Sequence, residues 1–104
     1  MRITENLDGR NLTLTLEGDL DSASSPGVER KMEEVLDLNI ESLDLDLGKV
    51  RYISSIGVRV LVIAYKKAMK GEKKISITGM SGKVREILDE VGILPLFTAK
   101  GKES

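Results

Sequence analysis

The hydrophobic pattern changes its period once along residues 42–71, and the change divides this segment into a strand and a helix. From Leu43 to Leu47, leucine alternates with polar residues, which is typical of a half-buried strand. From Ile56 onward the apolar residues follow the spacing of a helix that is buried over much of its circumference. They are Val58, Val60, Leu61, Val62, Ala64, Tyr65, Ala68 and Met69. Lys70 and Gly71 end the predicted helix, because a cation favours the last turn and glycine tolerates a left-handed cap.

The other segments show the same two periods. In chain order they predict strands at 2–7 and 11–17, a helix from about 25 to 38, the strand and helix just described, a strand at 74–78, a helix at 82–91, and a short edge strand at 97–99 before a charged tail at 100–104. Three of the strands alternate strictly, which implies that one sheet face covers the core and the other faces water or a partner. We therefore predict an α/β fold: a single domain over residues 1–104, with a mixed four- or five-stranded sheet and helices mainly on one face.

Polar residues follow three of the predicted strands. Strand–helix–strand connections of this length form right-handed crossovers between parallel strands, so these three loops leave the same edge of the sheet. Ligands of open α/β sheets bind at this carboxyl edge. The residues that it should bring together are Asp19, Asp21, Ser54, Ser55, Met80 and Ser81.

Two serines, Ser54 and Ser55, lie at the predicted start of the central helix. A serine hydroxyl accepts a hydrogen bond from the free amides of a first helical turn, and this capping stabilises a helix by about 1 kcal/mol over alanine. The same amides and the positive end of the helix dipole also attract an anion. A phosphate carried by Ser55 would lie there, so the pair predicts either a helix cap or a site of phosphorylation.

Composition limits the chemistry of the chain. There is no cysteine and no histidine, which removes disulfides, thiol nucleophiles, imidazole bases and most transition-metal sites. We expect Asp44 and Asp46 to lie on the wet face of their strand, and Asp19 and Asp21 to shape a turn and cap the next helix. We therefore expect no catalytic residue, no metal and no other cofactor, although a small nucleotide-binding or hydrolytic enzyme that uses Asp21 and Ser55 stays an alternative.

Charge and hydropathy limit the kinds of partner that the chain can bind. A net charge of -1 and three aromatic residues argue against a surface for nucleic acid, which needs excess positive charge and stacking platforms. The longest apolar run, from Val60 to Tyr65, is far shorter than a membrane span, so we expect no membrane insertion and a cytoplasmic protein. The chain has no glutamine and many charged residues, a bias that predicts high thermal stability. The oligomeric state is left open.

The segment 46–58, DLGKVRYISSIGV, resembles the signature of the anti-sigma factor antagonists, which are STAS domains. In that family a strand that ends in Asp-Leu-Ser-x-Val leads to Asp-Ser-[small]-Gly-Leu, and the serine is the phosphoacceptor. The resemblance implies that Ser55 is the acceptor here. Ser54 stands where the family usually has aspartate and offers a second hydroxyl, so it is the alternative acceptor, and Ile56 stands where the family has a small residue. Residues 18–21 and 84–97 also resemble the family.

The resemblance also implies a function. The unphosphorylated form would bind an anti-sigma factor with serine kinase activity and so release a sigma factor, with ATP and Mg²⁺ belonging to the kinase. The implied partner-binding residues are Asp19, Asp21, Ser22, Ser54, Ser55, Ile56, Gly57 and Arg59. The alternative is a STAS subunit of a stressosome or of a lipid-transport assembly, which would act as an unphosphorylated docking module.

Overall fold

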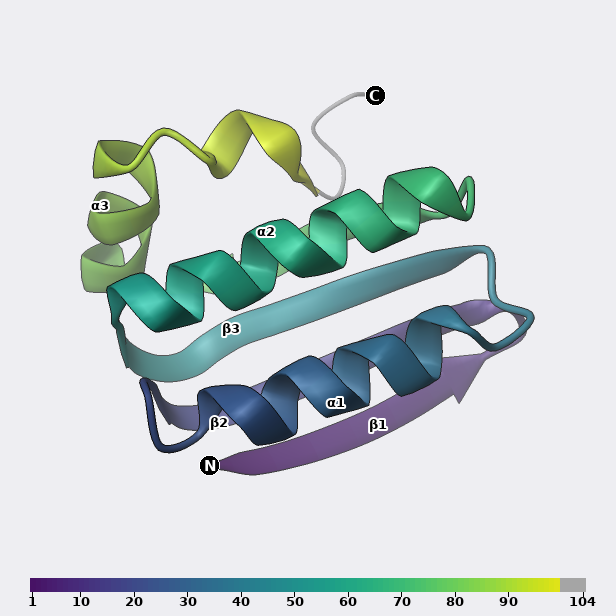
Figure 1. Ribbon diagram of the computed structural model, residues 1–104, viewed down its shortest axis with the longest axis horizontal. Coiled ribbons are helices and arrows are strands. Elements are labelled where there is room, and N and C mark those ends of the chain that lie inside the picture. Colours follow the sequence, from purple (N-terminus) through teal and green to yellow (C-terminus); the bar gives the residue numbers. More distant parts are fainter. Residues whose placement is uncertain (100–104) are drawn as a thin grey trace.

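The computed structural model describes residues 1–99, so the predicted charged tail at 100–104 lies outside the described residues. The order of the elements in the chain is shown in Figure 1. They are β1 (Arg2–Asp8), β2 (Asn11–Leu20), α1 (Ser25–Leu36), β3 (Ser42–Ile53), α2 (Ser55–Lys70), β4 (Lys74–Met80), α3 (Gly82–Glu90), the 3-10 helix η1 (Leu94–Leu96) and β5 (Thr98–Ala99). Within the described range, η1 is the one element that the pattern did not predict.

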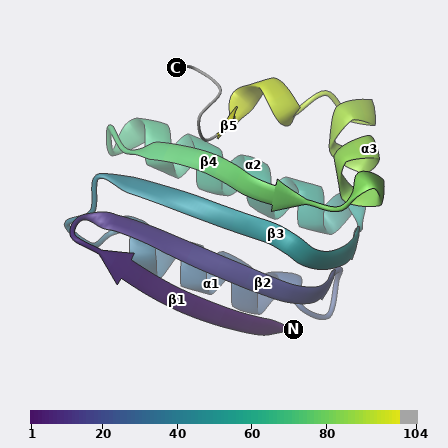
Figure 2. The same ribbon diagram turned by 180° about the vertical axis from the view of Figure 1, so that it is seen from behind.

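The strands form one five-stranded sheet in the order β1-β2-β3-β4-β5. Strands β1 and β2 are antiparallel, while the other neighbours are parallel, so the sheet is mixed. Figure 2 shows the open face of the sheet, with α1 and α2 side by side behind it and α3 beyond the end of β4. The prediction of a mixed sheet with helices mainly on one face is confirmed.

The core lies between this sheet and the helices α1 and α2. The alternating leucines of β2 and β3 supply its sheet side, and each of them is at most 2 % exposed. The helices contribute the residues that follow their 3.6-residue spacing, namely Val28, Met32, Val35, Leu36, Val60, Leu61, Ala64 and Ala68. Every second side chain of a strand lies on the same face of the sheet, and this places the leucines opposite the apolar stripes of the helices.

The pairing of β3 with β2 contains two irregularities. Thr15 pairs with Asp46, while Glu17 pairs with Lys49, so one extra residue of β3 lies between them, and a second lies before Tyr52. Such bulges shift the side-chain alternation by one position. The buried residues of the strand after Leu47 are therefore Val50 and Ile53.

The prediction that Asp44 lies on a wet face is wrong. Asp44 is only 6 % exposed, and the hydroxyl of Ser76 donates a hydrogen bond to its Oδ1 over 2.5 Å. Asp44 pairs directly with Ser76 across β3 and β4, in the middle of the sheet. A carboxylate that is flanked by strands on both sides and bonded to one of them is shielded from water, even on the face without helices. Asp46 is partly exposed and accepts a hydrogen bond from the N–H of Gly48.

Candidate functional site

The junction between β3 and α2 places the two serines differently. Ser54 is the N-cap of α2, and its hydroxyl accepts a hydrogen bond from the N–H of Gly57 over 3.3 Å. Ser55 is the first residue of the helix and is exposed. No hydrogen bond joins the Ser55 hydroxyl to another residue in the described part of the chain. One serine therefore caps the helix, while the other presents a free hydroxyl to solvent at its positive end.

Gly57 holds the first turn of α2 close to the end of β2. A Cβ atom at this position would lie 2.5 Å from the carbonyl oxygen of Leu20 and 2.8 Å from its Cγ. The N–H of Ser54 also donates to the same carbonyl over 2.9 Å. Gly57 is buried, so it sets the position of the helix rather than adding side-chain surface to the edge.

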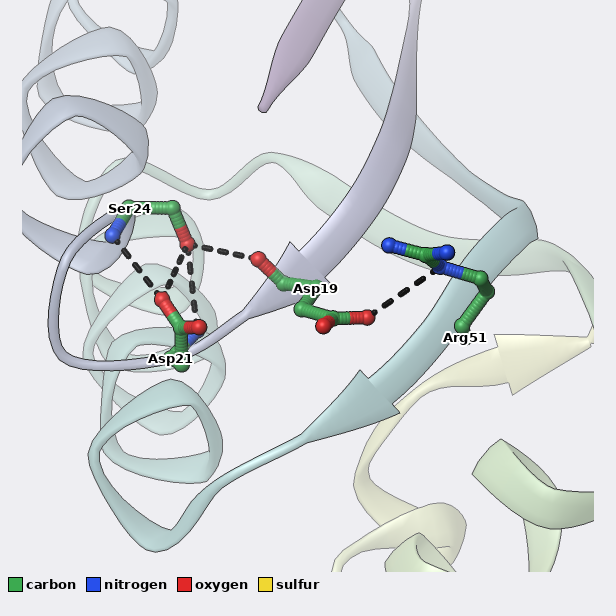
Figure 3. A network of polar contacts seen from close by, with 4 residues as sticks. All are labelled: Asp19, Asp21, Ser24 and Arg51. Atoms are coloured by element: carbon green, nitrogen blue, oxygen red, sulfur yellow. Dashed lines mark hydrogen bonds and ion pairs between the residues drawn. The ribbon is translucent and has the colours of Figure 1, made fainter.

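The loop after β2 is held by a network of hydrogen bonds around Asp21, which is shown in Figure 3. Its Oδ1 accepts from the N–H groups of Ala23 and Ser24, each over 3.1 Å. The Ser24 hydroxyl accepts from the N–H of Asp21 over 3.0 Å and donates to the carbonyl of Asp19 over 2.8 Å. The Asp21 carboxylate thus stabilises the turn that leads into α1, as an aspartate does in an Asx turn. Ser22 is exposed at the tip of this turn.

Asp19 lies beside the end of β3. It pairs with Tyr52 across the two strands, and its Oδ1 lies 3.4 Å from Nε of Arg51. Figure 3 shows this ion pair next to the turn of Asp21. The Arg51 side chain is largely exposed and that of Asp19 is partly exposed, so the pair is screened by water and adds little stability. An open cleft beside the pair is also lined by Met1, Arg2 and Gly18.

Two large apolar side chains are exposed near Ser55. Ile56 is 47 % exposed and Tyr52 is 46 % exposed. Arg59 is exposed one turn after Ser55 on the same side of α2, and the amine of Lys83 in α3 lies 6.0 Å from the centre of the Tyr52 ring. We call Tyr52, Ser55, Ile56 and Arg59 the serine surface. It combines apolar area, a free hydroxyl and positive charge, as protein-binding surfaces do.

The structure brings the ends of β2 and β3 together, as the sequence predicted, but β4 ends earlier along the sheet than these two strands. Strand β4 ends at Met80, which pairs with Leu47, whereas β3 continues to Ile53 beside β2 alone. Ser81 is the N-cap of α3, and its hydroxyl accepts from the N–H of Val84. Tyr52 was missed as a site residue. The alternation could have found it, because a buried Ile53 requires that the aromatic residue before it point outward.

Among residues 1–99, no group of three or more aspartate or glutamate side chains is placed to hold a metal ion. In the same range, no helix is both long and apolar enough to cross a membrane.

The fold and the serine surface define an α/β module with a helix N-terminus at the carboxyl edge of its sheet. The chain belongs to the STAS domain family, which matches residues 2–103. It is 30 % identical over 98 residues to BtrV of Bordetella bronchiseptica, which is named as a candidate anti-sigma factor antagonist, and the match covers 93 % of this chain and 84 % of BtrV.

Solved structures share the fold. The anti-sigma factor antagonist SpoIIAA in its unphosphorylated form has a TM-score of 0.82 at 14 % identity, over 98 % of this chain and 90 % of that one. The phosphorylated form of SpoIIAA from Bacillus gives 0.74 at 13 % identity, over 98 % and 94 % of the two chains. The STAS domain of a SulP transporter from Vibrio cholerae gives 0.71 at 25 % identity, over 89 % and 72 %.

Proposed function

We propose that this STAS domain is a phosphorylation-switched protein-binding module of the cytoplasm. In its unphosphorylated form it binds an anti-sigma factor that has serine kinase activity, and so releases a sigma factor. The observation that carries the proposal is the exposed Ser55, whose hydroxyl bonds to no other described residue at the start of α2. The relationship to a protein named as an antagonist supports the same function.

Ser55 is a better acceptor than Ser54 on structural grounds. The Ser54 hydroxyl already accepts from the N–H of Gly57, and Ser54 is partly buried. A kinase that modified Ser54 would have to remove this cap, which costs about 1 kcal/mol. Modification of Ser55 breaks no hydrogen bond in the described chain, so the acceptor can enter a kinase active site without unfolding the first turn.

The serine surface supports a switch that acts on the partner and leaves the fold intact. Ile56 and Tyr52 offer apolar area that a partner can bury, and Arg59 offers a cation. A phosphate on Ser55 adds about -1.5 to -2 charges at neutral pH. The first-turn amides and the positive end of α2 accommodate this charge within the domain. A partner that had packed against the bare hydroxyl meets both added bulk and added negative charge.

The deciding experiment begins by identifying the genes that neighbour the one encoding this chain. We expect one of them to encode a small histidine-kinase-like ATPase. The purified ATPase should bind the unphosphorylated domain, and should transfer phosphate to it when ATP and Mg²⁺ are present. Binding should then be lost. An ATPase that neither binds nor phosphorylates the domain contradicts the proposal.

The second candidate function is a docking module in a stressosome or in a lipid-transport assembly, without phosphorylation. The SulP transporter STAS domain is an example of the fold as part of a transporter. A transporter gene beside that of this chain, together with binding that is unchanged by Ser55→Ala and Ser55→Asp, would favour this function. In either case the chain binds and does not catalyse, and nucleotide binding by the isolated protein would count against both.

A further inference from the structure

Strand β1 forms one edge of the sheet, and among residues 1–99 its second side carries no neighbouring strand. It pairs only with β2, and each of its seven residues has its partner there. Figure 2 shows β1 along the outer side of the sheet. The outward backbone groups of such a strand are a ready template for another strand, so proteins usually shorten, charge or cover it.

The sequence of β1 is self-complementary when two copies run antiparallel. Cross-strand partners then share a face of the sheet, as they do in the existing pair of β1 and β2. With Glu5 on the two-fold axis, every other residue of the strand finds a partner of matching character. The pairs are Arg2 with Asp8, Ile3 with Leu7, Thr4 with Asn6, and Glu5 with its own copy.

This register is favoured over its neighbours. Antiparallel partners must both direct their backbone groups outward or both inward, so the strands can slip only in steps of two residues. A slip in one direction places Ile3 opposite Glu5, and a slip in the other places Leu7 opposite Glu5. Either slip also removes the two pairs of Arg2 with Asp8. Among these registers, only the full-length one places Arg2 opposite Asp8 and Ile3 opposite Leu7, so that opposite charges meet and apolar residues meet.

The side chains of β1 are available for these contacts. Leu7 is 59 % exposed, although its partner on β2 is the buried Leu12. Arg2 and Asp8 are exposed, and neither forms an ion pair with another residue in the range 1–99. Glu5 does have a partner, because the amine of Lys31 in α1 lies 2.8 Å from its Oε1. This hydrogen bond raises the pKa of Lys31, and the ammonium offsets the repulsion between two Glu5 carboxylates at the axis.

We propose that two copies of this chain associate through β1 and form one continuous sheet across a two-fold axis. Two seven-residue strands bury less area than a standard interface of about 1,600 Å², so the dimer depends on concentration and is not obligate. The serine surface lies at the end of β3 and the start of α2 and stays free in such a dimer, so association and partner binding are compatible. The proposal does not depend on the function of Ser55.

The test is sedimentation velocity over a concentration series, on the wild type and on two charge reversals. Arg2→Asp and Asp8→Arg each turn two attractive pairs into two repulsive pairs. We expect each variant to weaken the dimer roughly tenfold or more. An equimolar mixture of the two variants should dimerise again. In the mixed dimer the introduced aspartate of one copy faces the introduced arginine of the other, and the native Asp8 of the first copy faces the native Arg2 of the second.

Arg85→Asp is the matched control, since it reverses an exposed charge on α3 and should leave the dimer unchanged. Leu7→Lys is a second probe, which should weaken the dimer by placing a charge opposite Ile3. Melting temperatures confirm that each variant is folded. A wild type that stays monomeric throughout the series overturns the proposal. So does a dimer that resists both reversals, or a mixture that dimerises no better than the single variants.

Discussion

The N–H of Ser54 donates a hydrogen bond to the carbonyl of Leu20 over 2.9 Å, and this bond fixes the start of α2 to the end of β2. The two residues are far apart in the sequence but adjacent in the sheet, because Leu20 pairs with Ile53. The contact places the loop of Asp21 beside the N-terminus of α2. The candidate site is therefore made of two adjacent parts, the turn after β2 and the first turn of α2.

Gly57→Ala should destabilise the domain, although alanine is normally the better helix former. The added Cβ would lie 2.5 Å from the Leu20 carbonyl, so backbone must move. We expect a loss of about 1 to 3 kcal/mol in urea unfolding. Gly27→Ala in α1 is the control, since nothing lies within 4 Å of its added Cβ, and it should gain about 0.5 kcal/mol. Equal effects of the two substitutions would show that close packing at Gly57 is unimportant.

Leu61→Ala tests the assignment of the buried face of α2. Leu61 is fully buried between the helix and the sheet. Its truncation should cost about 2 to 5 kcal/mol in the free energy of unfolding, through lost burial and the cavity that remains. Met69→Ala is a suitable control on the same helix, because Met69 is 45 % exposed and should lose far less. A cost below about 1 kcal/mol for Leu61→Ala would contradict the packing described here.

The fold could be predicted because the spacing of apolar residues in the sequence indicates which face of each strand or helix is buried. Alternation in β2 and β3 and helical spacing in α2 identified core residues such as Leu45 and Leu61. Alternation says which face a residue is on, but not what crosses that face. Asp44 is therefore buried against Ser76, thirty-two residues away, where the pattern indicated water.

The candidate site was predictable in outline and not in detail. The resemblance to STAS domains indicated the pair Ser54 and Ser55, but the cap and the free hydroxyl differ by a single position, and helix starts cannot be read from sequence that finely. The bulges of β3, which bury Val50 between Leu47 and Ile53, depend on its register with β2, which no local pattern reports. The sequence also could not show that Gly57 touches Leu20.

Asp21 separates a role in the turn from a role in binding. Asp21→Asn keeps an oxygen that can accept from the N–H groups of Ala23 and Ser24, so the melting temperature should be nearly unchanged. Asp21→Ala removes this acceptor and should cost about 1 kcal/mol. If the charge of Asp21 also contacts the partner or helps to present Ser55 to the kinase, the asparagine variant should bind more weakly or be phosphorylated more slowly. Normal binding and phosphorylation of a stable asparagine variant would leave Asp21 with the turn alone.

Substitutions at the two serines test the switch itself. Ser55→Asp places a negative charge where the first-turn amides of α2 tolerate it, so the circular dichroism spectrum should be unchanged. Partner binding should be lost, because an unpaired charge in a fitted interface typically costs several kcal/mol. Ser55→Ala should bind the partner and resist inactivation by ATP.

The matched control is Ser54→Ala, which removes the hydroxyl that accepts from Gly57 and leaves Ser55 in place. It should lower the stability of the domain by about 1 kcal/mol, yet remain phosphorylatable. Mass spectrometry after treatment with the kinase and ATP distinguishes the two positions, since the peptides from the three variants differ in mass and in fragment ions. Phosphate on Ser54 alone, or on neither serine, would refute the assignment of Ser55, because the free hydroxyl at the start of α2 would then not be the group that the kinase selects.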